Sequence, residues 1–117
     1  MKYFSMFSGI GGIEIALQEL GHECVGYSEI ESHAIQIYEK HFKHKNFGDA
    51  TAINPDSLPD FELLAGGFPC QAFSRSGKRR GYKDSRGTLF FDVCRIAKAK
   101  KPRLILLENV ADILQHR

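Results

Sequence analysis

Tryptophan is absent from this 117-residue sequence, and only four prolines and three cysteines occur. Cys24, Cys70 and Cys94 form neither an even set nor a C-x-x-C pair, which argues against a disulfide framework and against a zinc site. No apolar run approaches the roughly 18 residues of a membrane helix. The apolar start lacks a signal-peptide cleavage site before Glu14 and Glu19. The sequence therefore predicts a cytoplasmic chain with neither a membrane partner nor a metal.

Charge is nearly balanced over the chain, with a formal net charge of +2, but it is unevenly placed. Residues 74–87 contain a single acidic residue, Asp84, among six basic ones: Arg75, Lys78, Arg79, Arg80, Lys83 and Arg86. Such a run is either an ordinary solvated loop or a flap that contacts phosphate groups. The three glycines of the loop, together with its place directly after Cys70, favour the second interpretation.

Short apolar runs alternate with helical patterns along the whole chain. Strands are predicted over residues 2–7, 23–28, 61–65 and 103–107, and helices over residues 13–20, 31–41 and 88–100. Apolar residues that are three and four positions apart mark the expected inner faces of the first and last helices: Ile13, Ala16, Leu17 and Leu20, then Leu89, Val93, Ile96 and Ala97. Cys24 and Cys94 are expected to be small core residues.

This alternation predicts the α/β class with a doubly wound, mostly parallel sheet covered by helices. Folds of this class bind ligands at the carboxyl ends of their strands. Each unusual cluster in the sequence directly follows a predicted strand. The clusters are residues 7–12, Glu29, Asp49, residues 66–70 and Glu108-Asn109.

The first cluster is a glycine-rich turn, FSGIGG, at residues 7–12. Glycines let the backbone approach a ligand while the amides at a helix start attract negative charge. The dinucleotide pattern G-x-G-x-x-G would need a third glycine where Glu14 stands, which disfavours a pyrophosphate. A ligand that carries only a carboxylate remains compatible, and so does a turn that merely allows close packing.

Glu29 and Asp49 are candidate ligand acceptors. Glu29 follows the second strand, where a carboxylate can accept hydrogen bonds from ribose hydroxyls. Asp49 could accept from an exocyclic amine, or it could instead form an Asx turn with Thr51.

Cys70 and Glu108 follow neighbouring predicted strands. The basic loop after Cys70 would favour its thiolate, and Pro69 restricts the backbone beside it. A thiolate and a carboxyl group at one edge could act together on an electrophilic ring: the thiolate adds while the acid holds a ring nitrogen. Taken singly, each residue is equally compatible with a structural role.

The order of these motifs resembles the cytosine-C5 DNA methyltransferases. The resemblance rests on FSGIGG at residues 7–12, Glu29, GDAT at 48–51, GGFPCQAFS at 66–74, RGTLFF at 86–91 and LLENV at 106–110. It implies a methyltransferase fold of the Rossmann-like type and attack by Cys70 on C6 of a cytosine that is flipped out of double-stranded DNA. It further implies that Glu108 contacts the ring, that Pro69 positions the base and that Asn109 braces the loop.

The same resemblance implies that the cofactor is S-adenosylmethionine. Its binding residues would be Phe7, Gly9, Ile10, Gly11, Gly12, Glu29, Ile30, Asp49, Ala50 and Leu89. Ile30 stands where some members of the family have an aromatic ring. The implied DNA contacts are Gln71, Ser74, Arg75, Ser76, Lys78, Arg79 and Arg80.

The family continues beyond the ENV motif with a target-recognition region, which residues 1–117 do not contain. The chain is thus interpreted as a partial catalytic domain whose incomplete sheet exposes an apolar edge, and we expect a C-terminal fragment or second subunit as partner. Alternatives are a transfer-RNA cytosine methyltransferase, a non-catalytic cofactor-binding or assembly subunit, and a nucleotide-dependent oxidoreductase.

Overall fold

The computed structural model describes residues 1–67 and 89–108, except for the side chain of Leu89. These residues form a four-stranded sheet, three α-helices and two short 3-10 helices. In chain order the elements are β1 (Lys2–Met6), α1 (Gly12–Glu19), β2 (Glu23–Ser28), α2 (Ser32–His41), η1 (Ala50–Ala52), η2 (Pro55–Ser57), β3 (Leu63–Gly66), α3 (Leu89–Lys100) and β4 (Leu104–Leu107).

All neighbouring strands of the sheet are parallel, in the order β2-β1-β3-β4. Met6 of β1 pairs with both Ser28 and Gly66, and Gly66 pairs with Leu107. The four strands therefore end side by side, and the loops that follow them share one edge of the sheet. This confirms the predicted α/β class with a parallel sheet.

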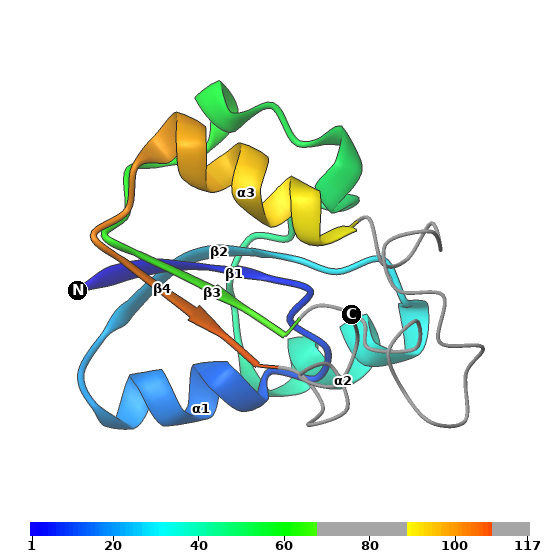
Figure 1. The fold of residues 1–117 in the computed structure, drawn as a ribbon. Helices are drawn as coiled ribbons and strands as arrows, with labels where there is room; N and C mark the ends of the chain where they lie inside the picture. Colours follow the sequence, from blue (N-terminus) through cyan, green and yellow to red (C-terminus); the bar gives the residue numbers. More distant parts are fainter. Residues whose placement is uncertain (68–88, 109–117) are drawn as a thin grey trace, which may run out of the picture.

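Helices cover both faces of the sheet, as Figure 1 shows: α1 and α2 lie on one side, and α3 lies on the other with the segment that contains η1 and η2. On the α3 side, a core forms around Phe4, Met6 and Leu64 of the sheet and Val93 and Ile96 of the helix. Phe4 stacks on Phe61 at a ring distance of 5.7 Å. Burial of such side chains supplies the main driving force for this layer.

The opposite face has two smaller apolar clusters. Tyr3, Leu17, Leu63 and Ala65 form one beneath α1. Beneath α2 the other cluster is aromatic: Tyr27, Tyr38 and Phe42, with the rings of Tyr27 and Tyr38 stacked 3.8 Å apart.

The inner face predicted for the first helix is only partly confirmed in α1. Ala16 is exposed and Leu20 is 72% exposed, while Glu14 is buried together with Leu17. The reason is that Leu20 caps the helix at its C-terminus, where the chain turns away before β2. Cys94 was also expected in the core but is exposed, because it follows inward-facing Val93 by one residue, about 100° around the helix.

Strand β4 differs from the other strands because its side chains are not packed. Leu104, Ile105, Leu106 and Leu107 are 38–53% exposed. Successive strand residues point to opposite faces, so both faces of β4 are open. The apolar edge that we expected an incomplete sheet to expose is therefore confirmed.

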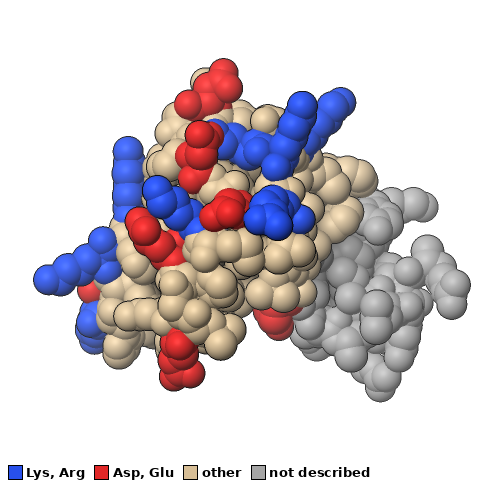
Figure 2. Space-filling view, turned by 90° about the vertical axis from the view of Figure 1, so that its left-hand side faces the viewer, with Lys and Arg blue, Asp and Glu red and all other residues tan. Residues whose placement is uncertain are grey.

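The amino ends of the strands carry charges of both signs. Figure 2 views the molecule from this side and shows Lys and Arg interspersed with Asp and Glu. Arg103 lies 3.9 Å from Glu62, and Lys100 lies 3.3 Å from Asp60. Within residues 1–67 and 89–108, no helix is long and apolar enough to cross a membrane.

Candidate functional site

A hollow of about 220 Å³ opens where β1 and β2 end. Its walls are predominantly apolar, with two carboxylates among the lining residues. These residues are Phe7, Gly9, Ser28, Glu29, Ile30, Gly48, Asp49, Ala50 and Gly67. The glycine turn and the segments around Glu29 and Asp49 were predicted separately from the sequence, and the fold brings them together.

The glycine turn is held in a conformation that most side chains avoid. Gly9 and Gly11 have φ angles of +59° and +98°, and Phe7 has a φ of +53°. A β-carbon on Gly11 would lie 2.5 Å from Cε2 of Phe42. Gly11 is therefore required both by its backbone angle and by the aromatic cluster beneath it. Phe7 stores strain at the edge of the hollow, a feature that clusters at binding sites.

Glu29 connects the loops that follow β1 and β2. Its Oε1 accepts a hydrogen bond from the amide of Gly9 at 2.8 Å, and its Oε2 accepts from the amides of Ile30 and Glu31 at 3.1 and 2.9 Å. A carboxylate has about four acceptor positions, so roughly one remains for a ligand hydroxyl. The chain itself thus orients the carboxylate toward the hollow.

Asn46 braces the same region, and the sequence analysis missed it. Its Oδ1 accepts from the amides of Glu29 at 3.2 Å and Gly48 at 2.9 Å, and its Nδ2 donates to the Glu29 carbonyl at 3.0 Å. Asn46 also forms a parallel bridge with Tyr27. A polar residue directly before Phe47 and Gly48 was the only signal for it in the sequence.

Asp49 forms the Asx turn that the sequence allowed. Its Oδ1 accepts from the backbone amide and the hydroxyl of Thr51, at 2.9 and 2.8 Å. No protein donor to Oδ2 is found within the described residues. Asp49 is exposed and lines the hollow, so the turn fixes one oxygen and leaves the other for a ligand donor.

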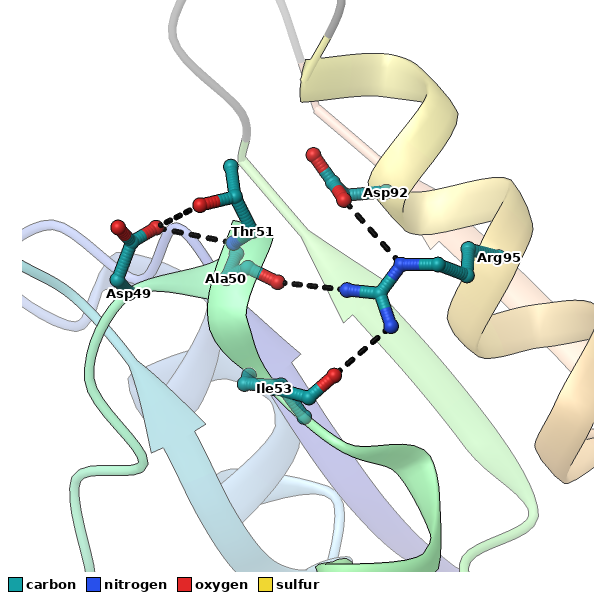
Figure 3. A network of polar contacts seen from close by, with 6 residues as sticks. All are labelled: Asp49, Ala50, Thr51, Ile53, Asp92 and Arg95. Carbon is teal, nitrogen blue, oxygen red and sulfur yellow. Dashed lines mark hydrogen bonds and ion pairs between the residues drawn. The ribbon is translucent and has the colours of Figure 1, made fainter.

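Arg95 of α3 fixes the wall that contains Asp49, and sequence reasoning missed it too. Its guanidinium donates to the carbonyl of Ile53 at 2.8 Å and to that of Ala50 at 2.9 Å, and its Nε lies 3.3 Å from Asp92 (Figure 3). Two charge-assisted hydrogen bonds, to the first residue and to the C-cap of η1, hold this short helix rigidly against α3. Helix α3 thereby sets the position of Ala50 in the hollow.

Ser28 is a third residue that the sequence analysis overlooked. It ends β2, is 1% exposed and lines the hollow, and its hydroxyl has no hydrogen-bond partner within the described residues. A buried hydroxyl without a partner is costly, so this position is suited to a ligand's polar group. The sequence signal was its place directly before Glu29 at a strand end.

Glu108 lies at a second hollow, of about 440 Å³, which shares Phe7, Gly9 and Gly67 with the first. The amide of Glu108 donates to the carbonyl of Gly66 at 2.8 Å. Its Oε2 lies 3.2 Å from the place where a β-carbon on Gly67 would be. The carboxylate therefore extends over the end of β3, three residues before Cys70.

Several predicted site residues lie outside the described residues. They are Pro69, Cys70, Gln71, Ser74, Arg75, Ser76, Lys78, Arg79, Arg80 and Asn109, and the side chain of Leu89 is also not described. Of the remaining predicted cofactor residues, Ile10 and Ile30 are exposed beside the glycine turn and Glu29. Gly12 lies at the second hollow. Among residues 1–67 and 89–108, no group of three or more His, Cys, Asp or Glu side chains could hold a metal.

Comparison with curated proteins finds relatives that match almost the whole chain. It is 46% identical over 116 residues to the type II methyltransferase M.HhaI of Haemophilus parahaemolyticus, covering 99% of this chain and 36% of that protein. It is 45% identical over 121 residues to the orphan methyltransferase M.Rho11sI of Bacillus phage rho11s, covering 99% of this chain and 24% of the phage protein. The chain thus spans between about a quarter and about a third of these relatives.

Solved structures show the same architecture. A DNA modification methyltransferase encoded within an E. coli prophage matches 98% of this chain and 33% of its own, with a TM-score of 0.82 and 27% identity. The S. pombe Dnmt2 methyltransferase has the same fold, with a TM-score of 0.72 and 21% identity over all of this chain and 38% of its own. The family model for C-5 cytosine-specific DNA methylases matches residues 1–117, and the chain therefore belongs to that family.

Proposed function

We propose that this chain forms the cofactor-binding and nucleophile-bearing part of an enzyme that transfers a methyl group from S-adenosylmethionine to C5 of cytosine in double-stranded DNA. The observation that carries the proposal is the pair of adjoining hollows at the strand ends. One hollow has acceptors suited to a nucleoside, and the other has Glu108 over the end of β3.

The first hollow fits the adenosine end of the cofactor. The remaining acceptor position of Glu29 suits a ribose hydroxyl, and Oδ2 of Asp49 suits an exocyclic amine. Phe7 and Ile30 supply apolar surfaces for the base. The hydroxyl of Ser28 supplies a further polar contact. When bound, S-adenosylmethionine supplies an activated methyl group.

The second hollow suits the reacting base. In the proposed reaction, the Cys70 thiolate adds to C6 of the cytosine while Glu108 holds the ring nitrogen N3. This addition makes C5 nucleophilic, so that C5 would form a bond to the methyl carbon while the sulfonium–methyl bond breaks and S-adenosylhomocysteine is released. Transfer of the C5 proton to water then lets the C6–sulfur bond break, which returns Cys70 as a thiolate and restores the aromatic ring. Because the attack needs an open face of the ring, the base must leave the duplex stack.

The basic loop after Cys70 is proposed to contact DNA phosphates through Arg75, Lys78, Arg79 and Arg80. Gln71, Ser74 and Ser76 are further proposed DNA contacts. Sequence readout requires groups that reach base edges in a groove, and we assign none to this chain. We propose that a second polypeptide portion supplies them and packs against β4. The exposed apolar residues of that strand support this partner.

Covalent trapping tests the reaction. The chain is mixed with S-adenosylmethionine and DNA that contains 5-fluorocytosine, with and without the remaining portion of a related methyltransferase as a separate polypeptide. We expect a denaturation-resistant adduct that depends on this second polypeptide. Because fluorine at C5 cannot leave as a proton does, the enzyme stays attached after methyl transfer.

Cysteine variants provide the matched control. Cys70→Ala should abolish the adduct, whereas Cys94→Ala, which changes an exposed cysteine on α3, should leave it unchanged. An adduct with transfer RNA instead of DNA would reassign the substrate. Binding of S-adenosylhomocysteine without any adduct would indicate a cofactor-binding assembly subunit. Binding of NADH, without binding of S-adenosylhomocysteine, would contradict the proposal entirely.

A further inference from the structure

Glu14 is a carboxyl group in the interior that the proposed reaction does not use. It is 0% exposed, and neither of its oxygens has a partner with hydrogen-bond geometry among the described residues. Neither hollow has Glu14 among its lining residues. Isolated carboxylates are very costly to bury, so a function other than ligand contact has to account for it.

The surroundings of Glu14 are polar but uncharged. Its neighbours come from every element packed against the first turn of α1 and include hydroxyls, a thiol and aromatic rings. They are Tyr3 and Ser5 of β1, Cys24 and Tyr27 of β2, and Tyr38 of α2. Beyond them, the Tyr38 hydroxyl lies 3.0 Å from Nδ1 of His44.

Burial favours the neutral form of this cluster. It raises the pKa of the Glu14 carboxyl above its ordinary value, and the hydroxyls of Tyr38 and Ser5 only partly oppose the rise. Burial also raises the pKa of the Cys24 thiol to about 11 and lowers that of His44. Among the described residues no cation acts on Glu14 to compensate a negative charge. The other charged groups that act on its neighbour Tyr27, Glu29 and Glu39, are acidic too, so ionisation of Glu14 would add a further negative charge to this cluster.

Tyr38 links this cluster to the glycine turn. A β-carbon on Gly11 would lie 3.2 Å from Cδ2 of Tyr38, so the Tyr38 ring lies directly beneath the turn while its hydroxyl lies near Glu14. Gly11 is the N-cap of α1 and Glu14 belongs to the first turn of that helix. Glu14 and the glycine turn therefore belong to one helix start and lie against the same Tyr38 side chain.

We propose that Glu14, buried near Ser5 and Tyr38, is a positioning residue that seats the first turn of α1 with its N-cap Gly11 and thereby fixes the glycine turn, including Gly9, at the first hollow. The proposal rests on the proposed cofactor site but adds a residue that makes no contact with the ligand. Ionisation of Glu14 would draw the carboxylate toward solvent and displace the turn. Cofactor affinity should then fall as the pH rises.

The first experiment needs no cofactor. Because the folded-state pKa of Glu14 lies above the unfolded value, its stabilising contribution is complete below the unfolded pKa and is lost as the pH rises through the folded pKa. Urea unfolding of the wild type is compared with that of Glu14→Gln from about pH 5 to about pH 8. The ratio of their unfolding constants should change by up to about tenfold per pH unit.

Glu19→Gln is the matched control, because Glu19 is an exposed carboxylate on the same helix. Its unfolding constant should keep a constant ratio to that of the wild type over the whole range. If Glu14→Gln behaves like Glu19→Gln, Glu14 ionises freely and the proposal is wrong.

The second experiment measures the affinity of S-adenosylhomocysteine by calorimetry at about pH 6 and about pH 8.5. Wild-type affinity should fall about fivefold or more, whereas Glu14→Gln, which keeps the shape without the charge, should retain near wild-type affinity at both values. Glu14→Ala should bind weakly at both.

Parallel pH dependence of the wild type and Glu14→Gln would overturn the positioning role, and so would equally weak binding by Glu14→Gln and Glu14→Ala. Absence of binding by every variant at both pH values would instead overturn the proposed cofactor site. The unfolding comparison would still decide whether the buried carboxyl is held neutral, so the two failures are distinguishable.

Discussion

The loops after β1 and β2 are tied together by the side chains of Glu29 and Asn46, whereas β4, at the far side of the same sheet, exposes four consecutive apolar side chains. Both regions belong to one parallel sheet. The difference lies in what packs on them. Helices α1, α2 and α3 cover the first three strands, while β4 has no comparable cover among the described residues.

The two regions therefore have different roles: one binds a ligand, and the other associates with a further molecule or segment. The cofactor side is preorganised, because its acceptors are oriented by hydrogen bonds from the chain's own backbone before any ligand arrives. The β4 side is a surface whose apolar groups gain free energy only when another molecule or segment covers them. Variants on the first side should therefore affect folding and ligand binding together, and variants on the second should affect association.

Gly11→Ala should have the largest effect. The substitution places a β-carbon 2.5 Å from the Phe42 ring on a residue with a φ of +98°. Backbone strain and overpacking together should cost about 3 kcal/mol of stability and abolish binding of S-adenosylhomocysteine. Urea unfolding and calorimetry measure both effects. Gly12→Ala is the control for stability alone: its β-carbon would meet nothing within 4 Å, so a similar loss of stability there would show that the clash with Phe42 is not the cause.

Arg95→Met should have an intermediate effect. It removes both hydrogen bonds to the carbonyls of Ala50 and Ile53, which releases the wall that carries Asp49. Because the guanidinium is partly exposed, we expect a loss of about 1–2 kcal/mol, together with weaker cofactor binding. Thermal unfolding and calorimetry test this. Lys98→Met, an exposed change on the same helix, should alter neither quantity, and equal behaviour of the two variants would contradict the clamp.

Leu106→Ala should have the smallest effect on folding, about 1 kcal/mol or less, because the side chain is already 46% exposed. The same change at Leu64, which is buried in the same sheet, should cost about 3 kcal/mol. Binding of the second polypeptide, followed by ultracentrifugation, should weaken clearly for Leu106→Ala. Unchanged association would show that β4 is not the contact surface.

Most of the strand and helix order could be predicted from the sequence. Residues 23–28 and 103–107 were predicted as strands, and β2 and β4 occupy Glu23–Ser28 and Leu104–Leu107. Residues 103–107 are an apolar run directly after Pro102, and residues 23–28 (ECVGYS) are a short segment between Gly21 and the start of the next helical pattern, so local patterns suffice. The place of Glu29 at the hollow also followed, because parallel strands end at a common edge. Asp49 was expected to follow a strand as well, and this is wrong: it reaches the same hollow as the N-cap of η1.

Details that depend on packing could not be predicted. The burial of Glu14 was not predicted, because periodicity alone cannot tell which face a short helix buries. Arg95 and Asn46 belong to no motif, and their partners lie far along the chain, at Ala50 and Ile53 for Arg95 and at Glu29 for Asn46. Only tertiary structure brings these groups within reach.

Glu29 carries a consequence for how ligand recognition is measured. The carboxylate oxygens that would bind a ribose also accept hydrogen bonds from the amides of Gly9, Ile30 and Glu31. A substitution of Glu29 therefore removes these bonds within the protein together with the ligand contact. The cleaner probe alters the ligand. A 2′,3′-dideoxy analogue leaves every bond of the carboxylate to the protein intact, and the affinity that it loses belongs to the sugar hydroxyls alone.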